Sequence, residues 1–220
     1  MFGVIWDLDG TLVDTESNHF RAWQALMREN GRDLTHEQFR PTFGLRNDDI
    51  LRDHFGFHGD AAAIDALSER KEELFRASLR DDGVRAQRGA HELVLHLRAL
   101  GAKQAIASSA PSPNIDLMLQ MLDVHAHFDA IVSADEVVHG KPAPDIVLRA
   151  AEKLGLPPAR CVVLEDAPAG VQAAKAAGSR SIAIAAAFPA ASLQAAGADL
   201  IVSSFGDVLW PVEEWEGFLK

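Results

Sequence analysis

The chain has 220 residues, of which 48% are hydrophobic and 24% charged, and its formal net charge is −11. This length and composition are typical of a globular protein with one substantial core, or with a core and a smaller insert. The negative charge argues against general nucleic-acid binding, which usually depends on a basic surface, and no apolar run approaches the ~18 residues that cross a bilayer. Because the chain begins directly with a strand-like segment and has one cysteine, Cys161, we expect a cytoplasmic protein without a signal peptide or an internal disulfide.

The first predicted element is an apolar strand over residues 2–6, which runs directly into the sequence DLDGT. Ionised carboxylates at the end of a buried strand are costly unless something pairs with them. Taken alone, the pattern also fits a helix N-cap or a solvated turn. Asp7 and Asp9 are therefore candidates for a functional site whose other members must come from elsewhere in the chain.

No strand pattern occurs from residue 16 to residue 82. Thr35 with Gln38 fits a capping box, and Asn47 and Asp60 are placed as N-caps of further helices. A structureless loop of this length is uncommon in a compact domain. The segment is therefore predicted to be a helical insert, which leaves the core beside the two aspartates and is well placed to act as a lid.

After the insert, strand and helix patterns alternate through the rest of the chain. Five more strands are predicted at residues 103–107, 129–132, 161–164, 181–185 and 199–202. Helical segments that stop at a glycine are predicted at residues 92–100, 145–154 and 169–177. The alternation predicts an α/β fold with a doubly wound parallel sheet, in which ligands bind beyond the carboxyl ends of the strands.

Polar residues follow three more strands or lie in the connections after them. They are Ser108 and Ser109 after QAIA, Lys141 in HGKPAPD, and Glu165 with Asp166 after CVVL. Each has a simpler interpretation alone, because serines and aspartates cap helices and loop lysines are usually solvated. Their convergence on the sheet edge that also carries Asp7 and Asp9 favours a single site.

Phosphoryl transfer is the chemistry that needs this set of groups. A carboxylate such as Asp7 can attack phosphorus and form an acyl phosphate. Mg²⁺ prefers carboxylate and carbonyl oxygens, which Asp7, Asp166 and the main-chain carbonyl of Asp9 can supply. Lys141 would neutralise the nucleophile and the phosphate, Ser108 would donate a hydrogen bond to a phosphate oxygen, and Asp9 would move a proton.

The chain resembles the haloacid dehalogenase superfamily of phosphohydrolases in four segments, which occur in that family's order: DLDGT, the serine after AIA, GKPAPD and LEDAPAG. The resemblance extends over essentially the whole chain. It implies a Rossmann-like catalytic core at residues 1–15 and 83–220 and an inserted α-helical cap at residues 16–82.

The same resemblance implies a role for each residue of the motifs. The implied catalytic residues are the nucleophile Asp7, the general acid/base Asp9, the phosphate donor Ser108 and the stabilising Lys141. The implied Mg²⁺ site consists of Asp7, Asp9, Glu165 and Asp166. Ala167 departs from the pattern, because many members of the family have serine there, and little catalytic effect is expected from it.

The insert matches the small α-helical cap of the subclass that contains phosphoglycolate phosphatase and β-phosphoglucomutase. Similarity to the mutase adds substrate-binding residues: Thr15 and His19 in DTESNHFRAW, Lys71 in SERKEELF, and Arg46 in GLRND. Ser109, next to Ser108, is also a candidate substrate-binding residue. In the mutase, the threonine, histidine and lysine assist the acid/base aspartate and the arginine holds the non-transferring phosphate. If the resemblance is set aside, a simpler interpretation is that His19 packs beside Trp23 and that Lys71 and Arg46 are solvated surface charges.

The resemblance implies an enzyme that uses Mg²⁺ and a phosphoaspartate intermediate to dephosphorylate a small sugar phosphate or similar metabolite. The alternative is a β-phosphoglucomutase that interconverts β-glucose 1-phosphate and glucose 6-phosphate, in which a sugar hydroxyl replaces water as the attacking group. A receiver-like phosphoaspartate signalling domain is a more distant alternative, but its acceptor normally follows a later strand and it has no large helical lid. We expect a monomer whose partner is a small phosphorylated metabolite, with no nucleic acid and no membrane.

Overall fold

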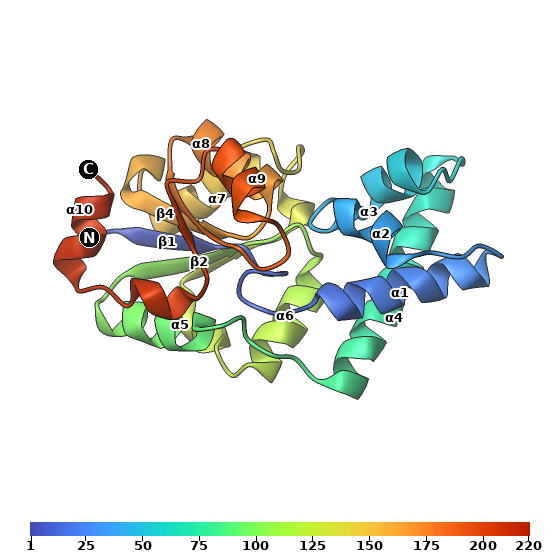
Figure 1. The fold of residues 1–220 in the computed structure, drawn as a ribbon, viewed down its shortest axis with the longest axis horizontal. Coiled ribbons are helices and arrows are strands. Elements are labelled where there is room, and N and C mark those ends of the chain that lie inside the picture. Colours follow the sequence, from blue (N-terminus) through green and yellow to red (C-terminus); the bar gives the residue numbers. More distant parts are fainter.

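The fold is built on a parallel β-sheet of six strands (Figure 1). The computed structural model describes residues 1–220, and its strands are β1 (Gly3–Trp6), β2 (Lys103–Ala107), β3 (Ala130–Val132), β4 (Cys161–Glu165), β5 (Arg180–Ile184) and β6 (Leu200–Val202). They lie in the order β3-β2-β1-β4-β5-β6, and every neighbouring pair is parallel. All six predicted strands are present. The strand order reverses at β1, which places a ligand crevice beside its carboxyl end.

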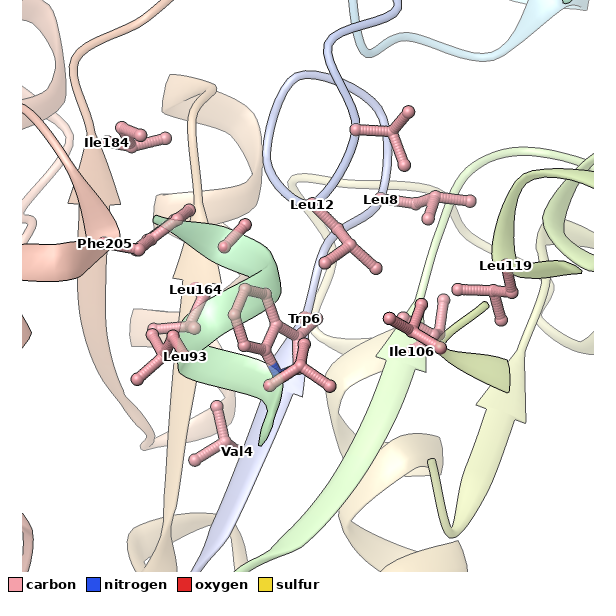
Figure 2. Close-up of a cluster of buried hydrophobic side chains, with 14 of the residues drawn as sticks. Val4, Trp6, Leu8, Leu12, Leu93, Ile106, Leu119, Leu164, Ile184 and Phe205 are labelled. Atoms are coloured by element: carbon pink, nitrogen blue, oxygen red, sulfur yellow. The ribbon is translucent and has the colours of Figure 1, made fainter. Parts of the chain in front are cut away.

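Helices cover both faces of the sheet. One face is covered by α5 (Ala90–Ala99), α6 (Ser112–Met121) and α10 (Val212–Phe218). The other face is covered by α7 (Asp145–Leu154) and α8 (Pro168–Ala177). The short helix α9 (Ala190–Ala195) packs against β5. Because successive side chains of a strand point to opposite faces, Val4 and Trp6 join the first core and Ile5 joins the second. Figure 2 shows Trp6 within the first core, near Leu93 of α5. The central strand is therefore buried on both sides, which fixes the position of the residues that follow it.

Residues 16–82 have helices as their only secondary-structure elements, as predicted. They are α1 (Glu16–Glu29), α2 (His36–Phe39), a 3₁₀ turn (Arg40–Thr42), α3 (Asn47–Asp49), a π-helical turn (Ile50–His54) and α4 (Ala61–Asp82). These helices have a core of their own, in which Trp23, Phe39 and Ile50 are buried. Figure 1 shows α1 and α4 beyond one end of the sheet, on the side opposite both chain termini. We call this helical unit the cap.

Two of the three capping predictions in the cap are confirmed. Thr35 and Gln38 form a capping box, and the Asp60 carboxylate accepts a hydrogen bond from the Ala63 amide at 2.9 Å at the start of α4. The Asn47 prediction is wrong, because Arg46 occupies the N-cap position of α3. None of the helices, in the cap or in the core, has the length and apolar character needed to cross a membrane.

The two connections between cap and core are hydrogen-bonded to each other. Val13 and Ala86 form an antiparallel bridge. The Asp14 amide donates to the Arg85 carbonyl at 2.9 Å, and the Gln87 amide donates to the Leu12 carbonyl at the same distance. The cap is therefore joined to the core by a short two-stranded ribbon.

Candidate active site

Polar residues from three neighbouring strands meet at the carboxyl edge of the sheet, as the sequence predicts. Asp7 follows β1, Ser108 follows β2, and Glu165 ends β4. Because β1 lies between β2 and β4 in parallel register, these three strand ends are adjacent. The sheet topology therefore brings Asp7 next to two residues that are each more than 100 positions away from it in the chain.

Lys141 joins two of the carboxylates. Its Nζ lies 2.5 Å from Asp7 Oδ1 and 2.6 Å from Glu165 Oε1, and its side chain is only 6% exposed. Burial by itself would lower the pKa of Lys141, but the two carboxylates outweigh burial and raise that pKa above its usual value. Lys141 is therefore held as an ammonium ion against Asp7.

Asp7 is balanced between opposing influences. Burial raises the pKa of its carboxyl group, and the nearby charges of Glu165 and Asp9 raise it as well, whereas Lys141 lowers it. Together these influences raise the pKa of Asp7 to about 7. A further positive charge in the site would favour the ionised carboxylate.

Asp166 supplies a direct indication of where such a charge fits. Thr11 Oγ1 donates to Asp166 Oδ1 at 3.0 Å, but the buried Oδ2 has no hydrogen-bond partner. Burial, followed by the charges of Glu165 and Asp7, raises the pKa of this carboxyl well above its ordinary value. Carboxylate oxygens of Asp7, Glu165 and Asp166 lie within 4.8 Å of one another. An orphaned carboxylate oxygen in an all-oxygen donor set fits a hard divalent cation such as Mg²⁺.

Glu165 accepts hydrogen bonds on both of its carboxylate oxygens, unlike Asp7 and Asp166. Its Oε2 accepts from the amides of Asp166 and Ala167, both at 2.9 Å, and its Oε1 accepts from Lys141. The observed contacts thus hold Lys141 and the turn after β4. Direct ligation of a metal by Glu165 stays a prediction.

Gly170 makes room for this glutamate, which leads to a prediction about stability. A Cβ at Gly170 in α8 would lie 1.6 Å from Glu165 Oε1, whereas a Cβ at Gly217 in α10 would meet nothing within 4 Å. Alanine is the better helix former, so we expect Gly217→Ala to stabilise the protein by at most about 1 kcal/mol. Gly170→Ala should instead destabilise it by about 1–3 kcal/mol, because Glu165 must move. Denaturant unfolding of both variants checks this, and equal stabilities would contradict it.

Asp9 is contacted by Thr15, the N-cap residue of α1, and by His19 of the cap. Its Oδ1 accepts from Thr15 Oγ1 at 2.7 Å and lies 3.0 Å from His19 Nε2. Lys71 Nζ lies 2.9 Å from the other ring nitrogen, Nδ1. An ammonium group only donates, so Nδ1 accepts and the ring proton is assigned to Nε2, which donates to Asp9. The structure therefore brings together Asp9 and the three predicted residues Thr15, His19 and Lys71.

These contacts favour the ionised form of Asp9. Burial would raise the pKa of its carboxyl group, but His19, Thr15 and Lys71 outweigh burial and lower that pKa. Burial and the Lys71 charge lower the pKa of His19, which agrees with a neutral ring. Hydrogen bonds reach only one carboxylate oxygen of Asp9, so Oδ2 is available to a ligand.

Asp7 and Asp9 line one small cavity of about 50 Å³ between cap and core. Ser108 and Ser109 line it from the core, and His19 with Lys71 lines it from the cap. Ser108 Oγ accepts from the Ala110 amide at 3.0 Å, and its hydroxyl hydrogen makes no bond within the protein. The cavity thus contains two carboxylates and a hydroxyl donor, with room for only a few water molecules.

Arg46 does not line this cavity, and its side chain pairs with Asp48 rather than with another predicted site residue. Its Nε lies 3.4 Å from Asp48 Oδ1, and it lines a neighbouring cavity of about 400 Å³. Asn47, Glu72 and Ser109 line both cavities. Arg46 therefore lines a cavity that adjoins the one lined by Asp7.

Three further residues support the site and were not predicted to do so. Thr11 holds Asp166, and its position in DLDGT is a signal that sequence reasoning overlooked. Glu72 follows Lys71 directly and bonds to it at 2.8 Å. Asn114, on α6, donates to Glu72 Oε2, although the two residues are 42 positions apart in the chain. No sequence pattern predicts that contact.

A model of the haloacid dehalogenase-like hydrolase family matches residues 3–178, a span that contains every site residue described above. The chain belongs to the haloacid dehalogenase-like hydrolases. The resemblance seen in the four motifs is thereby confirmed.

Relatives of this haloacid dehalogenase-like hydrolase include phosphatases and phosphomutases. Fructose-1-phosphate phosphatase YqaB of Escherichia coli K12 is 33% identical over 184 residues, which cover 80% of this chain and 92% of that protein. Beta-phosphoglucomutase of Bacillus subtilis is 31% identical over 228 residues, with 99% and 97% covered. Protein SUPPRESSOR OF QUENCHING 1, chloroplastic, of Arabidopsis thaliana is 38% identical over 214 residues, but the chain spans only 20% of its length. The chain is accordingly an enzyme of the phosphatase and phosphomutase type.

A solved structure agrees with the fold. The crystal structure of a HAD hydrolase, family IA, variant 3, from Entamoeba histolytica matches with a TM-score of 0.89 at 28% identity, and the match covers 100% of this chain and 99% of that one. The predicted fold class, a doubly wound Rossmann-like core with an inserted helical cap, is confirmed.

Proposed function

We propose that this enzyme is a Mg²⁺-dependent phosphohydrolase that forms a phosphoaspartate on Asp7 and dephosphorylates a small sugar phosphate or similar metabolite. One observation carries the proposal: Asp7 and Asp9 line the same small cavity, with Lys141 bonded to the first and a cap histidine bonded to the second. A nucleophile and a proton-transfer group are thus side by side, each with its own partners.

Asp7 attacks the phosphorus atom and displaces the sugar oxygen. The Lys141 ammonium favours the ionised form of Asp7 and balances charge on the phosphate, and the Ser108 hydroxyl donates to a phosphate oxygen. Mg²⁺ held by Asp7, Asp166 and the main-chain carbonyl of Asp9 would supply further neutralisation of the phosphoryl charge.

Asp9 transfers a proton in each half of the reaction. The contacts above favour the ionised form of Asp9, so solvent must supply the proton for the first turnover. In the first half the carboxyl group gives this proton to the departing sugar oxygen, and in the second half the carboxylate takes a proton from the attacking water and so regains it. Thr15 and His19 both bond to Oδ1, which leaves Oδ2 to exchange the proton.

We further propose that residues 16–82 form a mobile cap and that Arg46, Lys71 and Ser109 contact the substrate. The cavity of about 50 Å³ is far smaller than the ~300 Å³ or more typical of ligand sites. The cap must therefore swing away from the core to admit a sugar phosphate, and its return excludes bulk water.

β-Phosphoglucomutase activity is the second candidate. The observation in its favour is the set of contacts from Thr15, His19 and Lys71 towards Asp9, because these are residues in which the chain resembles the mutase. Arg46 does not line the cavity of Asp7, whereas a mutase needs to hold a second phosphate while the first one is transferred. That position favours the phosphatase.

The two candidates differ in their products. We expect the enzyme, with Mg²⁺ present, to release phosphate from several sugar phosphates without any bisphosphate primer. Incubation with a panel that includes fructose 1-phosphate and β-glucose 1-phosphate, with free phosphate and isomerised sugar both measured, checks this. A mutase would instead isomerise β-glucose 1-phosphate once primed with the bisphosphate, and His19→Ala would impair isomerisation more than slow loss of phosphate to water. Primer-dependent isomerisation with negligible phosphate release would overturn our assignment.

A further inference from the structure

A chain of hydrogen bonds runs from Asp9 across the cap and back to the core. His19 Nε2 lies 3.0 Å from Asp9, Lys71 Nζ lies 2.9 Å from His19 Nδ1, and Lys71 also donates to Glu72 Oε1 at 2.8 Å. Glu72 Oε2 accepts from Asn114 Nδ2. The first and last members belong to the core, and the three between them belong to the cap.

Asn114 forms hydrogen bonds with two cap side chains. Its amide nitrogen donates to Glu72, and its amide oxygen accepts from Arg76 NH1 at 2.8 Å. Glu72 and Arg76 lie four positions apart on α4, so both are on the face that meets α6. Asn114 is fully buried in the structure. An amide suits this place because it donates and accepts at the same time.

The intermediate groups have little freedom to reorient. Lys71 and Glu72 have side chains that are only 2% and 9% exposed. Lys71 lies over the rings of Trp23 and Phe75, at 5.3 and 5.1 Å, and the His19 ring stacks on Phe75 with centroids 4.0 Å apart. A displacement of Glu72 is therefore transmitted to Lys71 and His19.

We propose that Asn114 is a positioning residue for proton transfer by Asp9. It holds Glu72 in place when the cap is docked, and Glu72 in turn fixes the Lys71 ammonium that sets the orientation and tautomer of His19. When the cap leaves the core, Asn114 and Glu72 separate, and the support for His19 weakens. The proposal rests on the proposed function of Asp9, and it adds that the acid/base group is properly arranged only while the cap is docked.

The test uses the full enzyme and an aryl phosphate whose leaving group needs no acid. Asn114→Ala should lower kcat for sugar phosphates about 10- to 100-fold, because the misplaced relay no longer orients Asp9. With the aryl phosphate it should also create a burst of phenol, since hydrolysis of the phosphoenzyme still needs Asp9 as a base. Asn18→Ala is the matched control, because Asn18 is also a buried asparagine and donates to Ser78 at 2.9 Å within the cap. It should show near wild-type kcat and no burst.

A reciprocal exchange separates positioning from simple stability. Asn114→Asp alone places a second carboxylate against Glu72 and should lower kcat further than Asn114→Ala does. Glu72→Gln combined with Asn114→Asp restores a donor and an acceptor on the two sides and should recover most of the lost kcat. If the single variants change only the unfolding temperature, with kcat and burst as in the wild type, or if the double variant shows no recovery, the positioning role is wrong. If the wild-type enzyme itself releases no phosphate from any ester, the proposed function is what fails.

Discussion

Asp7→Asn is expected to abolish phosphate release from every ester tested while leaving the protein folded. The amide is neutral and cannot attack phosphorus as a carboxylate does, so no phosphoaspartate forms. Its oxygen can still accept from Lys141, and the change removes one of three crowded carboxylates, so the unfolding temperature should not fall. Phosphate-release assays together with thermal unfolding check both parts.

The matched control for this change is Asp14→Asn, which removes an exposed carboxylate seven positions away. That variant should behave like the wild type. Excess chelator should also stop the wild-type enzyme, and added Mg²⁺ should restore it, because Asp166 keeps an unpartnered oxygen beside Asp7. Appreciable activity of Asp7→Asn, or full activity in excess chelator, would contradict the proposed function.

Asp9→Asn should lower turnover of sugar phosphates by about 10²–10⁴-fold, the usual contribution of a positioned general acid or base. Asparagine can neither protonate the departing sugar oxygen nor take a proton from water. With an aryl phosphate the first half-reaction needs no acid, so the variant should release a burst of phenol equal to the enzyme concentration and then stall as phosphoenzyme.

Rapid-mixing absorbance gives the burst amplitude, and intact mass measurement detects the added phosphoryl group. The wild-type enzyme should show steady release with no burst. A variant that hydrolyses sugar phosphates at the wild-type rate would show that Asp9 is not the proton-transfer group. Equal losses for both substrates without any phosphoenzyme would place its role before phosphoryl transfer.

The residues at the edge of the sheet could be predicted from sequence because the parallel topology determines where the strands end. Once β1, β2 and β4 are recognised as parallel strands, their carboxyl ends must lie on one edge, and Asp7, Ser108 and Glu165 meet there. Lys141 needed the family motif as well, because a lysine in a loop has no fixed direction in the sequence pattern.

The contacts between cap and core could not be predicted in the same way. Asn114 and Glu72 meet only because α4 and α6 pack across the domain boundary, and no periodicity within either helix encodes that packing. Asn47 resembles an N-cap in sequence, yet its amide donates to Glu72 Oε1 at 2.6 Å. A tertiary hydrogen bond has replaced the local one.

Three helices of the core were not singled out by the sequence patterns: α6, α9 and α10. The helix α6 ends at Met121 with Leu122 as its C-cap residue, and the left-handed residue that follows is Asp123 rather than glycine. The helix α9 has only six residues. The helix α10 is placed by Trp215, which stacks on Phe2 from the other end of the chain.

The hydrogen-bonded ribbon at Val13 and Ala86 has a consequence for how this chain can change. The core is interrupted by an insertion whose two ends are held next to each other. The entropic cost of closing this loop depends only weakly on the length of the insertion, because doubling the length adds only ~0.6 kcal/mol to the free energy of closure. A different module could therefore replace the helices between the two ribbon strands without disturbing the sheet or Asp7. The same catalytic core can thus acquire a new specificity by exchanging one contiguous segment of sequence.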